Sequence, residues 1–240
     1  MKKILQICLL LFIPLGAFAS VGIELEDADI DLTDHQSLEN GAHLYVQYCL
    51  GCHSTKYIRY LSLADDFNID QQEILKKVAP EGAGIYDKML TAMNRHDAKK
   101  WFGTAPPDLS LIARSRGEDW LVSYLKGFYQ DTSKQRGVNN TVFPDVAMPN
   151  PLWQLQGVQK ATIKTIDGHK VITGLVITEP GTMTAKQFDK AVNDIVAFLV
   201  YAGEPAQVQR RSMGKYVLLF ILMFGVIAYL LKKEYWKDVH

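Results

Sequence analysis

The chain has few cysteines, no surplus of charge, and no internal repeat or low-complexity segment. Only three of its 240 residues are cysteine, namely Cys8, Cys49 and Cys52. Its 26 basic and 26 acidic residues cancel at neutral pH, and we expect no nucleic-acid partner. Without repeats, the simplest organisation of the segment between the two ends is one compact domain of about 190 residues.

Long apolar runs occur only at the two ends of the chain. At the N-terminus, Lys2 and Lys3 precede an apolar stretch from Ile4 to Phe18, and Ala17-Phe18-Ala19 has the small-residue pattern of a cleavage site. An uncleaved anchor is the alternative, but the stretch is short for a membrane span. We therefore expect a signal peptide over residues 1–19, whose removal also removes Cys8.

The C-terminal run, from Tyr216 to Leu231, contains no charged residue and is bounded by Lys215 and by Lys232-Lys233. At about 1.5 Å per residue, such a helix covers most of a ~30 Å hydrocarbon layer. A buried helix of a soluble core is the alternative, but such helices seldom lack polar residues on every face. These ends predict four parts: a signal peptide (1–19), an exported domain (20–212), a transmembrane anchor (213–232) and a cytoplasmic tail (233–240).

The two cysteines of the exported domain lie in the pentapeptide Cys49-Leu50-Gly51-Cys52-His53. Two thiols at this spacing can each form a thioether with one edge of a porphyrin, while the adjacent imidazole ligates the iron. The motif thus predicts one covalently attached haem c, held by Cys49 and Cys52, and an electron carrier.

A redox dithiol, a short disulfide and half of a zinc site are the alternatives for Cys49 and Cys52. A structural zinc site normally takes four protein ligands, and no third cysteine remains after export. A thioredoxin-like pair is expected near a strand-helix-strand pattern, whereas the preceding segment, Leu38 to Tyr48, has the pattern of a helix. Both observations favour haem attachment.

The rest of the domain is expected to be mainly α-helical with one inserted β-hairpin. In the helix before the motif, Gly41 and Tyr45 share a face suited to close packing against another helix. The alternation from Thr162 to Ile177 around Asp167-Gly168 predicts the hairpin. Four further helices are expected: one capped by Asp70 and ending before Pro80, one over Tyr86–Asn94, one from Glu118 through Tyr129, and one opened by the capping box Thr184-x-x-Gln187 and closed by Gly203 and Pro205.

An N-terminal helix leading into the haem motif and a C-terminal helix crossing it is the organisation of class I cytochromes c. There, the second axial ligand of the iron comes from a loop ahead of the last helix. Met148 lies in a proline-stiffened loop with neither helical nor strand period, so we expect it to be that ligand, with His53 as the first. The alternatives are a packing role, as expected for Met89 and Met93, and a bis-histidine pair completed by His43 or His96. Met183 lies at the start of a predicted helix.

Seven acidic residues precede Lys56, the first basic residue after the predicted signal peptide. A solvated, poorly ordered arm is one interpretation of this segment. The other is a negative patch that steers a lysine-rich cytochrome towards the haem. The sequence leaves both open for these residues: Glu24, Glu26, Asp27, Asp29, Asp31, Asp34 and Glu39.

Several segments in order resemble cytochrome c1, the haem subunit of bacterial ubiquinol-cytochrome c oxidoreductase, the cytochrome bc1 complex. The resemblance covers essentially the chain after the signal peptide. Besides the haem motif, it rests on Ala105-Pro106-Pro107-Asp108-Leu109-Ser110, Ala113-Arg114-Ser115-Arg116-Gly117-Glu118-Asp119, Ala147-Met148-Pro149, Tyr201-Ala202-Gly203-Glu204-Pro205 and Arg211-Ser212-Met213-Gly214. An additional cysteine pair of some bacterial relatives is missing here.

The resemblance implies that Pro107 and Arg116 line the haem pocket, with Arg116 paired to a haem propionate. It further implies a single-pass protein of the bacterial inner membrane with its haem domain in the periplasm. Cytochrome b beside the anchor, a Rieske iron-sulfur protein as electron donor and a cytochrome c as acceptor are the implied partners, within a dimeric complex. The chain would be an enzyme only as part of that complex, and we assign no catalytic residue.

A second hypothesis from another class is a free-standing, membrane-anchored c-type cytochrome that serves a different oxidase or reductase. A third is a membrane-tethered dithiol protein without haem. The two cytochrome hypotheses share the haem site and differ in partners, and the third differs in the chemistry of the two cysteines.

Overall fold

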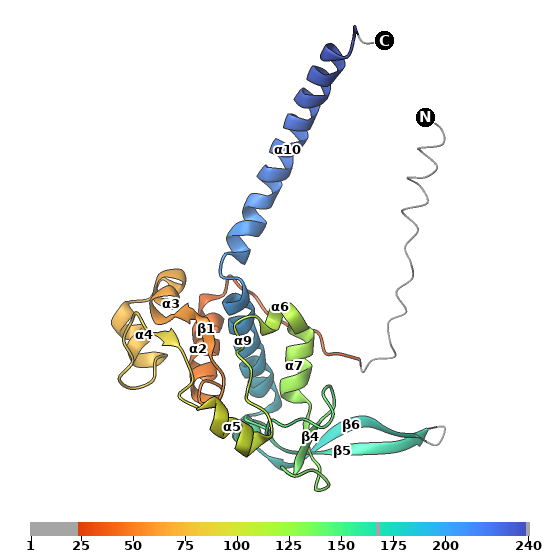
Figure 1. Ribbon diagram of the computed structural model, residues 1–240. Helices are drawn as coiled ribbons and strands as arrows, with labels where there is room; N and C mark the ends of the chain where they lie inside the picture. The colour runs from red at the N-terminus through yellow and green to blue at the C-terminus, as the bar shows by residue number, and fades with distance from the viewer. Residues whose placement is uncertain (1–23, 167–168, 239–240) are drawn as a thin grey trace.

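The fold is that of a computed structural model, which describes residues 24–166 and 169–238. The predicted signal peptide at 1–19 and the hairpin turn at Asp167-Gly168 lie outside the described residues. Figure 1 shows a mainly helical domain from which one long C-terminal helix projects and one β-hairpin extends. The predicted fold class is therefore confirmed.

Two long helices cross at the centre of the domain. Helix α2 (His35–Tyr48) starts at Asp34, whose carboxylate accepts hydrogen bonds from the main-chain N–H groups of Gln36 and Ser37. Helix α9 (Ala185–Gly203) starts at the predicted capping box of Thr184 and Gln187. Five apolar residues at helical spacing along α9 are buried: Phe188, Val192, Ile195, Val196 and Leu199.

The crossing of α2 and α9 depends on Gly41, as its helical spacing predicted. A Cβ atom at this position would lie 1.9 Å from the main-chain oxygen of Asp194 and 2.6 Å from its carbonyl carbon. The Asp194 carboxylate is buried beside this contact and accepts hydrogen bonds from Ser37 Oγ (2.6 Å) and Lys190 Nζ (3.0 Å). Close backbone approach and a satisfied buried carboxylate thus fix how the two helices cross.

Shorter elements surround this pair and form three two-stranded antiparallel sheets, β1–β2, β3–β4 and β5–β6. In chain order they are β1 (Thr55–Arg59), α3 (Tyr60–Phe67), α4 (Gln71–Lys77), β2 (Lys88–Met89), α5 (Arg95–Phe102), α6 (Ile112–Arg116), α7 (Glu118–Lys126), β3 (Phe128–Gln130), β4 (Val138–Asn140), α8 (Trp153–Gln156), β5 (Gly157–Ile166) and β6 (His169–Pro180). The predicted Asp70 cap of α4 is confirmed, because its side chain accepts from the N–H groups of Gln72 and Glu73.

The prediction of a helix over Tyr86–Asn94 is wrong, because this segment contains strand β2. The carbonyls of Ile85 and Asp87 accept hydrogen bonds from the first main-chain N–H groups of α3, at 2.8 and 3.2 Å. These contacts hold the segment extended, and Met89 pairs with Thr55 in the β1–β2 ladder. Met89 is therefore buried in a strand and not in a helix.

The helix predicted from Glu118 through Tyr129 is right in its start and wrong in its end. Helix α7 ends at Lys126, since Gly127 lies against Thr141 and the next three residues pair with β4. A Cβ atom on Gly127 would lie 2.5 Å from Thr141 Oγ1. The main-chain N–H of Thr141 also donates to the Gly127 carbonyl at 3.0 Å, and these contacts with the segment after β4 end the helix.

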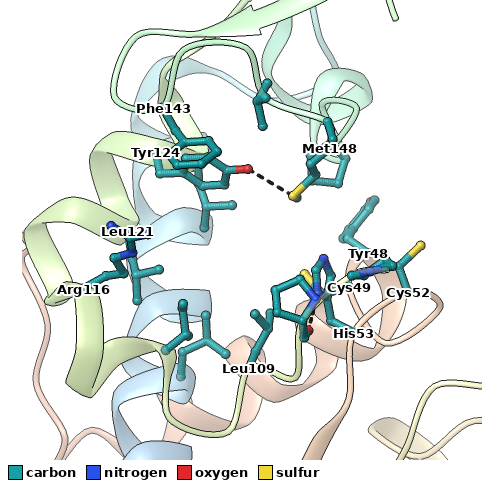
Figure 2. Close-up of a pocket in the computed structure, with 18 of the residues that line it drawn as sticks. Tyr48, Cys49, Cys52, His53, Leu109, Arg116, Leu121, Tyr124, Phe143 and Met148 are labelled. Carbon is teal, nitrogen blue, oxygen red and sulfur yellow. Dashed lines mark hydrogen bonds between the residues drawn. The ribbon is translucent and has the colours of Figure 1, made fainter. Parts of the chain in front are cut away.

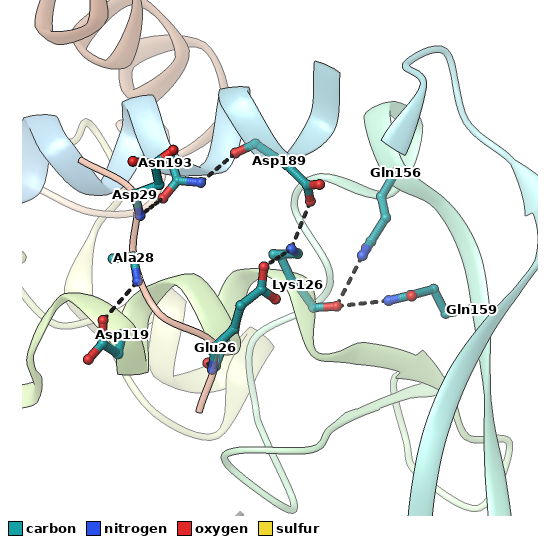
Figure 3. Close-up of polar contacts among 10 residues, drawn as sticks. Glu26, Ala28, Asp29, Asp119, Lys126, Gln156, Gln159, Asp189 and Asn193 are labelled. Carbon is teal, nitrogen blue, oxygen red and sulfur yellow. Dashed lines mark hydrogen bonds and ion pairs between the residues drawn. The ribbon is translucent and has the colours of Figure 1, made fainter. Parts of the chain in front are cut away.

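The acidic N-terminal arm follows the outer side of α7 and α9 from residue 24 onwards. The main-chain N–H groups of Glu26, Ala28 and Asp29 donate to Ser123 Oγ, an Asp119 carboxylate oxygen and Asn193 Oδ1, at 2.8, 2.8 and 3.0 Å. Figure 3 shows this arm beside Lys126, whose ammonium pairs with Glu26 and, at 2.7 Å, with Asp189. The interpretation as a poorly ordered arm is therefore wrong for this segment.

The C-terminal helix α10 (Gln207–Tyr235) leaves the domain directly after α9. It is long and apolar enough to cross a membrane, and none of its most apolar window is buried in the protein. Glu204, between the two helices, pairs with Arg114 of α6 at 2.8 Å and with Arg210 of α10. Among residues 24–166 and 169–238, α10 is the one helix with the length and composition of a membrane span, and these ion pairs tie it to the domain.

Candidate functional site

A cavity of about 350 Å³ lies between the C-terminal end of α2, helices α6, α7 and α9, and the loops around residues 104–109 and 143–151. Figure 2 shows His53 and the two cysteines on one side of it and Met148 on the opposite side. The cavity brings together all six site residues predicted from the sequence: Cys49, Cys52, His53, Pro107, Arg116 and Met148.

His53 is held in one orientation by its surroundings. Its Nδ1 lies 2.8 Å from the carbonyl oxygen of Pro107, and its own carbonyl accepts a hydrogen bond from the Tyr45 hydroxyl at 2.6 Å. A carbonyl can only accept, so Nδ1 carries the proton and Nε2 keeps its lone pair. Burial lowers the pKa of His53 below its usual value of 6.5, which also favours the neutral imidazole that binds metals.

The two cysteines lie in the turn that ends α2. The main-chain N–H of Cys49 donates to the carbonyl of Tyr45, and that of His53 donates to the carbonyl of Cys49, both at 2.8 Å. Both thiols are free, with Cys49 buried and Cys52 partly exposed. Burial raises the pKa of Cys49 to about 12 and raises that of Cys52, so neither is poised as a thiolate. A redox dithiol needs a lowered thiol pKa, so this environment disfavours that alternative.

Met148 lies in a loop shaped by two buried asparagines. Asn139 Oδ1 accepts from the N–H of Asp145, and Asn140 Oδ1 accepts from the N–H groups of Val142 and Phe143, at 2.8–3.1 Å. These bonds anchor the loop where it leaves β4. The sulfur of Met148 reaches the cavity opposite His53 and accepts a hydrogen bond from the Tyr124 hydroxyl at 3.3 Å.

Arg116 lines the cavity from the end of α6, where its guanidinium lies 5.0 Å from the ring centroid of Trp120. No ion pair to Arg116 exists within the part of the chain that the structure describes. Its charge is therefore available to an anionic group in the cavity. Pro107 contributes both a wall of the cavity and the carbonyl that orients His53.

The other methionines and histidines considered as ligands lie elsewhere. Met89 is fully buried in the hydrophobic core, and Met183 is partly buried and packs against that core. His43 bonds through Nδ1 to the carbonyl of Lys77, and His96 is largely exposed beside Asp97 on α5. Neither histidine lines the cavity, so the bis-histidine alternative lacks support in the geometry.

The sequence interpretation missed several residues that line the cavity. Tyr124 lies in the helix predicted from Glu118, and a hydroxyl among the apolar residues of that helix was the available signal. Phe102 and Tyr48 carried no such signal, because each is the last residue of a helix whose orientation depends on the whole fold. The remaining unforeseen lining residues include Thr104, Phe143, Ile195 and Leu199.

The donor set fits a haem covalently attached through two thioethers. A thiol pair and a neutral imidazole face a thioether across one largely apolar cavity, and a guanidinium is available at its edge. Among residues 24–166 and 169–238, no three His, Cys, Asp or Glu side chains are grouped as a metal cluster would require. The fold and site thus define a membrane-anchored c-type cytochrome.

The profile of the Cytochrome C1 family matches residues 27–88 and 81–239. The chain belongs to the cytochrome c1 family of electron carriers. It is 46% identical to cytochrome c1 of Allochromatium vinosum, with both chains covered completely. It is also 42% identical to a Nitrosomonas europaea protein named ammonia monooxygenase gamma subunit, over 100% of this chain and 99% of that one. Its sequence identity to Rhodospirillum rubrum cytochrome c1 is 27%, over 86% of this chain and 83% of the relative.

Proposed function

We propose that this chain is the cytochrome c1 subunit of a respiratory cytochrome bc1 complex, passing single electrons from a Rieske iron-sulfur protein to a cytochrome c. The observation that carries the proposal is Met148 facing His53 across one cavity, with Cys49 and Cys52 on the same wall as the imidazole. The full-length similarity to a cytochrome c1 supports the choice of complex.

In this proposal Cys49 and Cys52 would hold one haem c through thioether bonds, and His53 Nε2 and Met148 Sδ would ligate its iron. When bound, haem c supplies reversible one-electron chemistry at iron, and Met/His ligation raises its reduction potential. The protein orients the imidazole through Pro107 and excludes water with the apolar lining of the cavity. Because outer-sphere electron transfer makes no bond to the protein, no general base or nucleophile is needed.

Arg116 has a separate role at the edge of the cavity. A guanidinium pairs strongly with a carboxylate through parallel hydrogen bonds, so Arg116 would bind a haem propionate. Stacking on Trp120 restricts the side chain before the haem is present. This arrangement accounts for an exposed arginine that forms no ion pair among the described residues.

The proposed location is the inner membrane of a bacterium. The predicted signal peptide (1–19) exports the domain (20–212) to the periplasm, the anchor (213–232) crosses once beside cytochrome b, and the tail (233–240) stays in the cytoplasm. The anchor agrees with the exposed apolar helix α10. A dimeric complex is expected for this class of enzyme.

Purification in mild detergent through a C-terminal tag, followed by a pyridine haemochrome spectrum, tests the proposal. The expected result is one haem c per chain, together with cytochrome b and the Rieske protein. A c-type spectrum without those two subunits would instead support a free-standing cytochrome. Absence of a c-type band would support the dithiol hypothesis and contradict both cytochrome functions.

The second candidate, a membrane-anchored cytochrome serving another enzyme, is favoured by one observation. The Nitrosomonas relative is named as a subunit of an ammonia monooxygenase, although its similarity also extends over the full length of this chain. The same purification separates the candidates, because a different oxidase or oxygenase would then replace cytochrome b among the co-purifying subunits.

A further inference from the structure

The haem cavity is bordered by a basic surface that also exposes a tryptophan. Phe102 at the end of α5 lines the cavity, and the adjacent Trp101 is 60% exposed. Arg136, from the loop between β3 and β4, lies over the Phe102 ring at 4.6 Å and donates to the Trp101 carbonyl at 2.6 Å. The Arg136 guanidinium therefore holds both Trp101 and Phe102 in place at the edge of the cavity.

The charges on this surface are mostly positive. Helix α5 carries three basic side chains and one acidic side chain, Asp97, which lies beside His96. Within the described residues, Lys99 and Lys100 are exposed and neither has an ion-pair partner. Asp145, the acidic residue of the Met148 loop, is already paired with Lys134.

The acidic arm lies on the other side of the helix that walls the cavity. It bonds to Asp119 and Ser123 of α7, whereas Leu121, Tyr124 and Leu125 of the same helix line the cavity. A helix with its side chains is about 10 Å across, so α7 separates the arm from the haem site. The negative charge is thus displaced from the surface where an electron leaves.

We propose that the surface formed by Arg95, Lys99, Lys100, Trp101 and Arg136, here called the α5 surface, is the docking site for an acidic soluble electron carrier. This inference rests on the proposed function and specifies the charge of its acceptor. The carrier is the class of partner that complements unpaired lysines around an exposed aromatic anchor. Such a partner differs from the lysine-rich cytochrome that the acidic arm suggested.

The chemistry at this surface is the transfer of one electron. The acceptor is reduced by one electron, the haem iron is oxidised by one, and no covalent bond or proton is exchanged. Productive docking therefore needs only close approach to the cavity and fast release, which suits a small interface steered by charge. Trp101 provides the apolar centre and the lysines provide the long-range attraction.

Oxidation of the reduced, detergent-solubilised complex by probes of opposite charge tests the proposal. The small probes are ferricyanide, an anion, and tris(phenanthroline)cobalt(III), a cation, and the protein probes are one acidic and one lysine-rich soluble c-type cytochrome. For the unmodified chain we expect the acidic cytochrome to react faster, with a rate that falls as salt rises. In the double variant Lys99→Glu, Lys100→Glu, the rates with ferricyanide and the acidic cytochrome should each fall by about tenfold at low ionic strength, and those with the cationic probes should rise.

A matched control reverses two exposed lysines away from the cavity, Lys76→Glu and Lys88→Glu, with rates expected to stay within about twofold. Trp101→Ala should slow oxidation by the acidic cytochrome about tenfold and leave the rate with ferricyanide unaffected, since only a protein partner uses the aromatic contact.

Rates that are equal in both double variants, or faster reaction of the lysine-rich cytochrome with the unmodified chain, would overturn the docking proposal while leaving the electron carrier intact. Failure of every probe to oxidise a c-type haem would overturn the proposed function itself.

Discussion

The hydroxyl of Tyr124 donates a hydrogen bond to the sulfur of Met148 at 3.3 Å, joining the helical wall of the cavity to the loop opposite His53. Burial raises the pKa of Tyr124 to about 12, so the hydroxyl keeps its proton at neutral pH and remains a donor. The bond both holds the methionine side chain in the cavity and withdraws electron density from its sulfur. Tyr124 is therefore a positioning residue for the proposed iron ligand.

Replacement of Tyr124 by Phe should lower the reduction potential of the haem. A sulfur that loses this hydrogen bond becomes a better donor to oxidised iron, which stabilises the oxidised form. A net hydrogen bond of about 0.5–1.4 kcal/mol corresponds to about 20–60 mV for a one-electron couple. Potentiometric titration of Tyr124→Phe measures this shift. Tyr48→Phe is the control, since Tyr48 lines the same cavity without bonding to Met148; equal potentials in the two variants would contradict the tuning role.

Replacement of Met148 by Leu should leave the haem covalently attached and lower its potential, on the order of 100 mV, because an aliphatic side chain cannot ligate iron. The visible spectrum and a redox titration report the change. His53→Ala should abolish the native low-spin spectrum altogether. A Met148→Leu protein with unaltered spectrum and potential would remove Met148 from the ligand set.

The sequence predicted the parts of the fold that depend on local signals. Asp70, Thr184 and Gln187 cap their helices through neighbouring N–H groups, and each cap is found where it was predicted. The segment around Met89 was mispredicted because its conformation depends on long-range pairing with β1 and on carbonyls that cap α3. Such contacts leave no periodic trace in the chain.

The residues of the candidate site also fall into two groups, those marked by local sequence signals and those placed by tertiary packing. The haem motif and the proline-rich loop marked His53 and Met148 directly, whereas Tyr124 and Phe102 reach the cavity through the tertiary packing of α7 and α5. The acidic arm was recognised by composition, but its route over Asp119, Ser123 and Asn193 was not, because main-chain donors carry no sequence signature. Residue type alone therefore located the ligands and missed much of their support.

Gly41→Ala should destabilise the domain, since the added carbon would lie 1.9 Å from the Asp194 oxygen and force α2 away from α9. Overpacking of this kind costs about 1–3 kcal/mol, which lowers the melting temperature by about 2–12 °C in a domain of this size. Thermal unfolding followed by circular dichroism gives the value. Gly214→Ala serves as the control, because nothing lies within 4 Å of a Cβ atom there, and equal melting temperatures would show that the crossing can relax.

The connection between domain and anchor should weaken in acid. Hydrogen bonding to Arg210 holds the pKa of Glu204 below its usual value of 4.5, with Arg114 contributing as well. Because the pKa of Glu204 is lower in the folded protein, its charge stabilises the fold at any pH above 4.5. This stabilisation is lost as the pH falls through the lowered pKa of the folded state and Glu204 becomes protonated. Limited proteolysis at residues 203–207 should be slow from pH 7 to about 5 and faster below about 4. Glu204→Gln should be cleaved quickly at both pH values; slow cleavage of this variant at pH 7 would contradict the role of the ion pairs.

The acidic arm is expected to act in stability and not in acceptor docking. Neutralising two of its exposed carboxylates with Asp27→Asn and Asp31→Asn should leave the oxidation rate by any soluble cytochrome within about twofold at low salt. Ser123→Ala, which removes an acceptor for the main chain of Glu26, should instead speed proteolysis of the arm. A large salt-dependent loss of oxidation rate in the first variant would restore a docking role for the arm.

Helix α9 is at once a wall of the cavity and the segment that leads into the membrane helix. Ile195 and Leu199 line the cavity, and only Glu204, Pro205 and Ala206 separate the end of α9 from α10. At about 1.5 Å per residue, these two cavity residues lie about 6 and 12 Å along the helix axis from Gly203, the last residue of α9. In the proposed complex this short connection would hold the haem at a nearly fixed height above the bilayer, and encounters with membrane-bound partners would be a search in two dimensions.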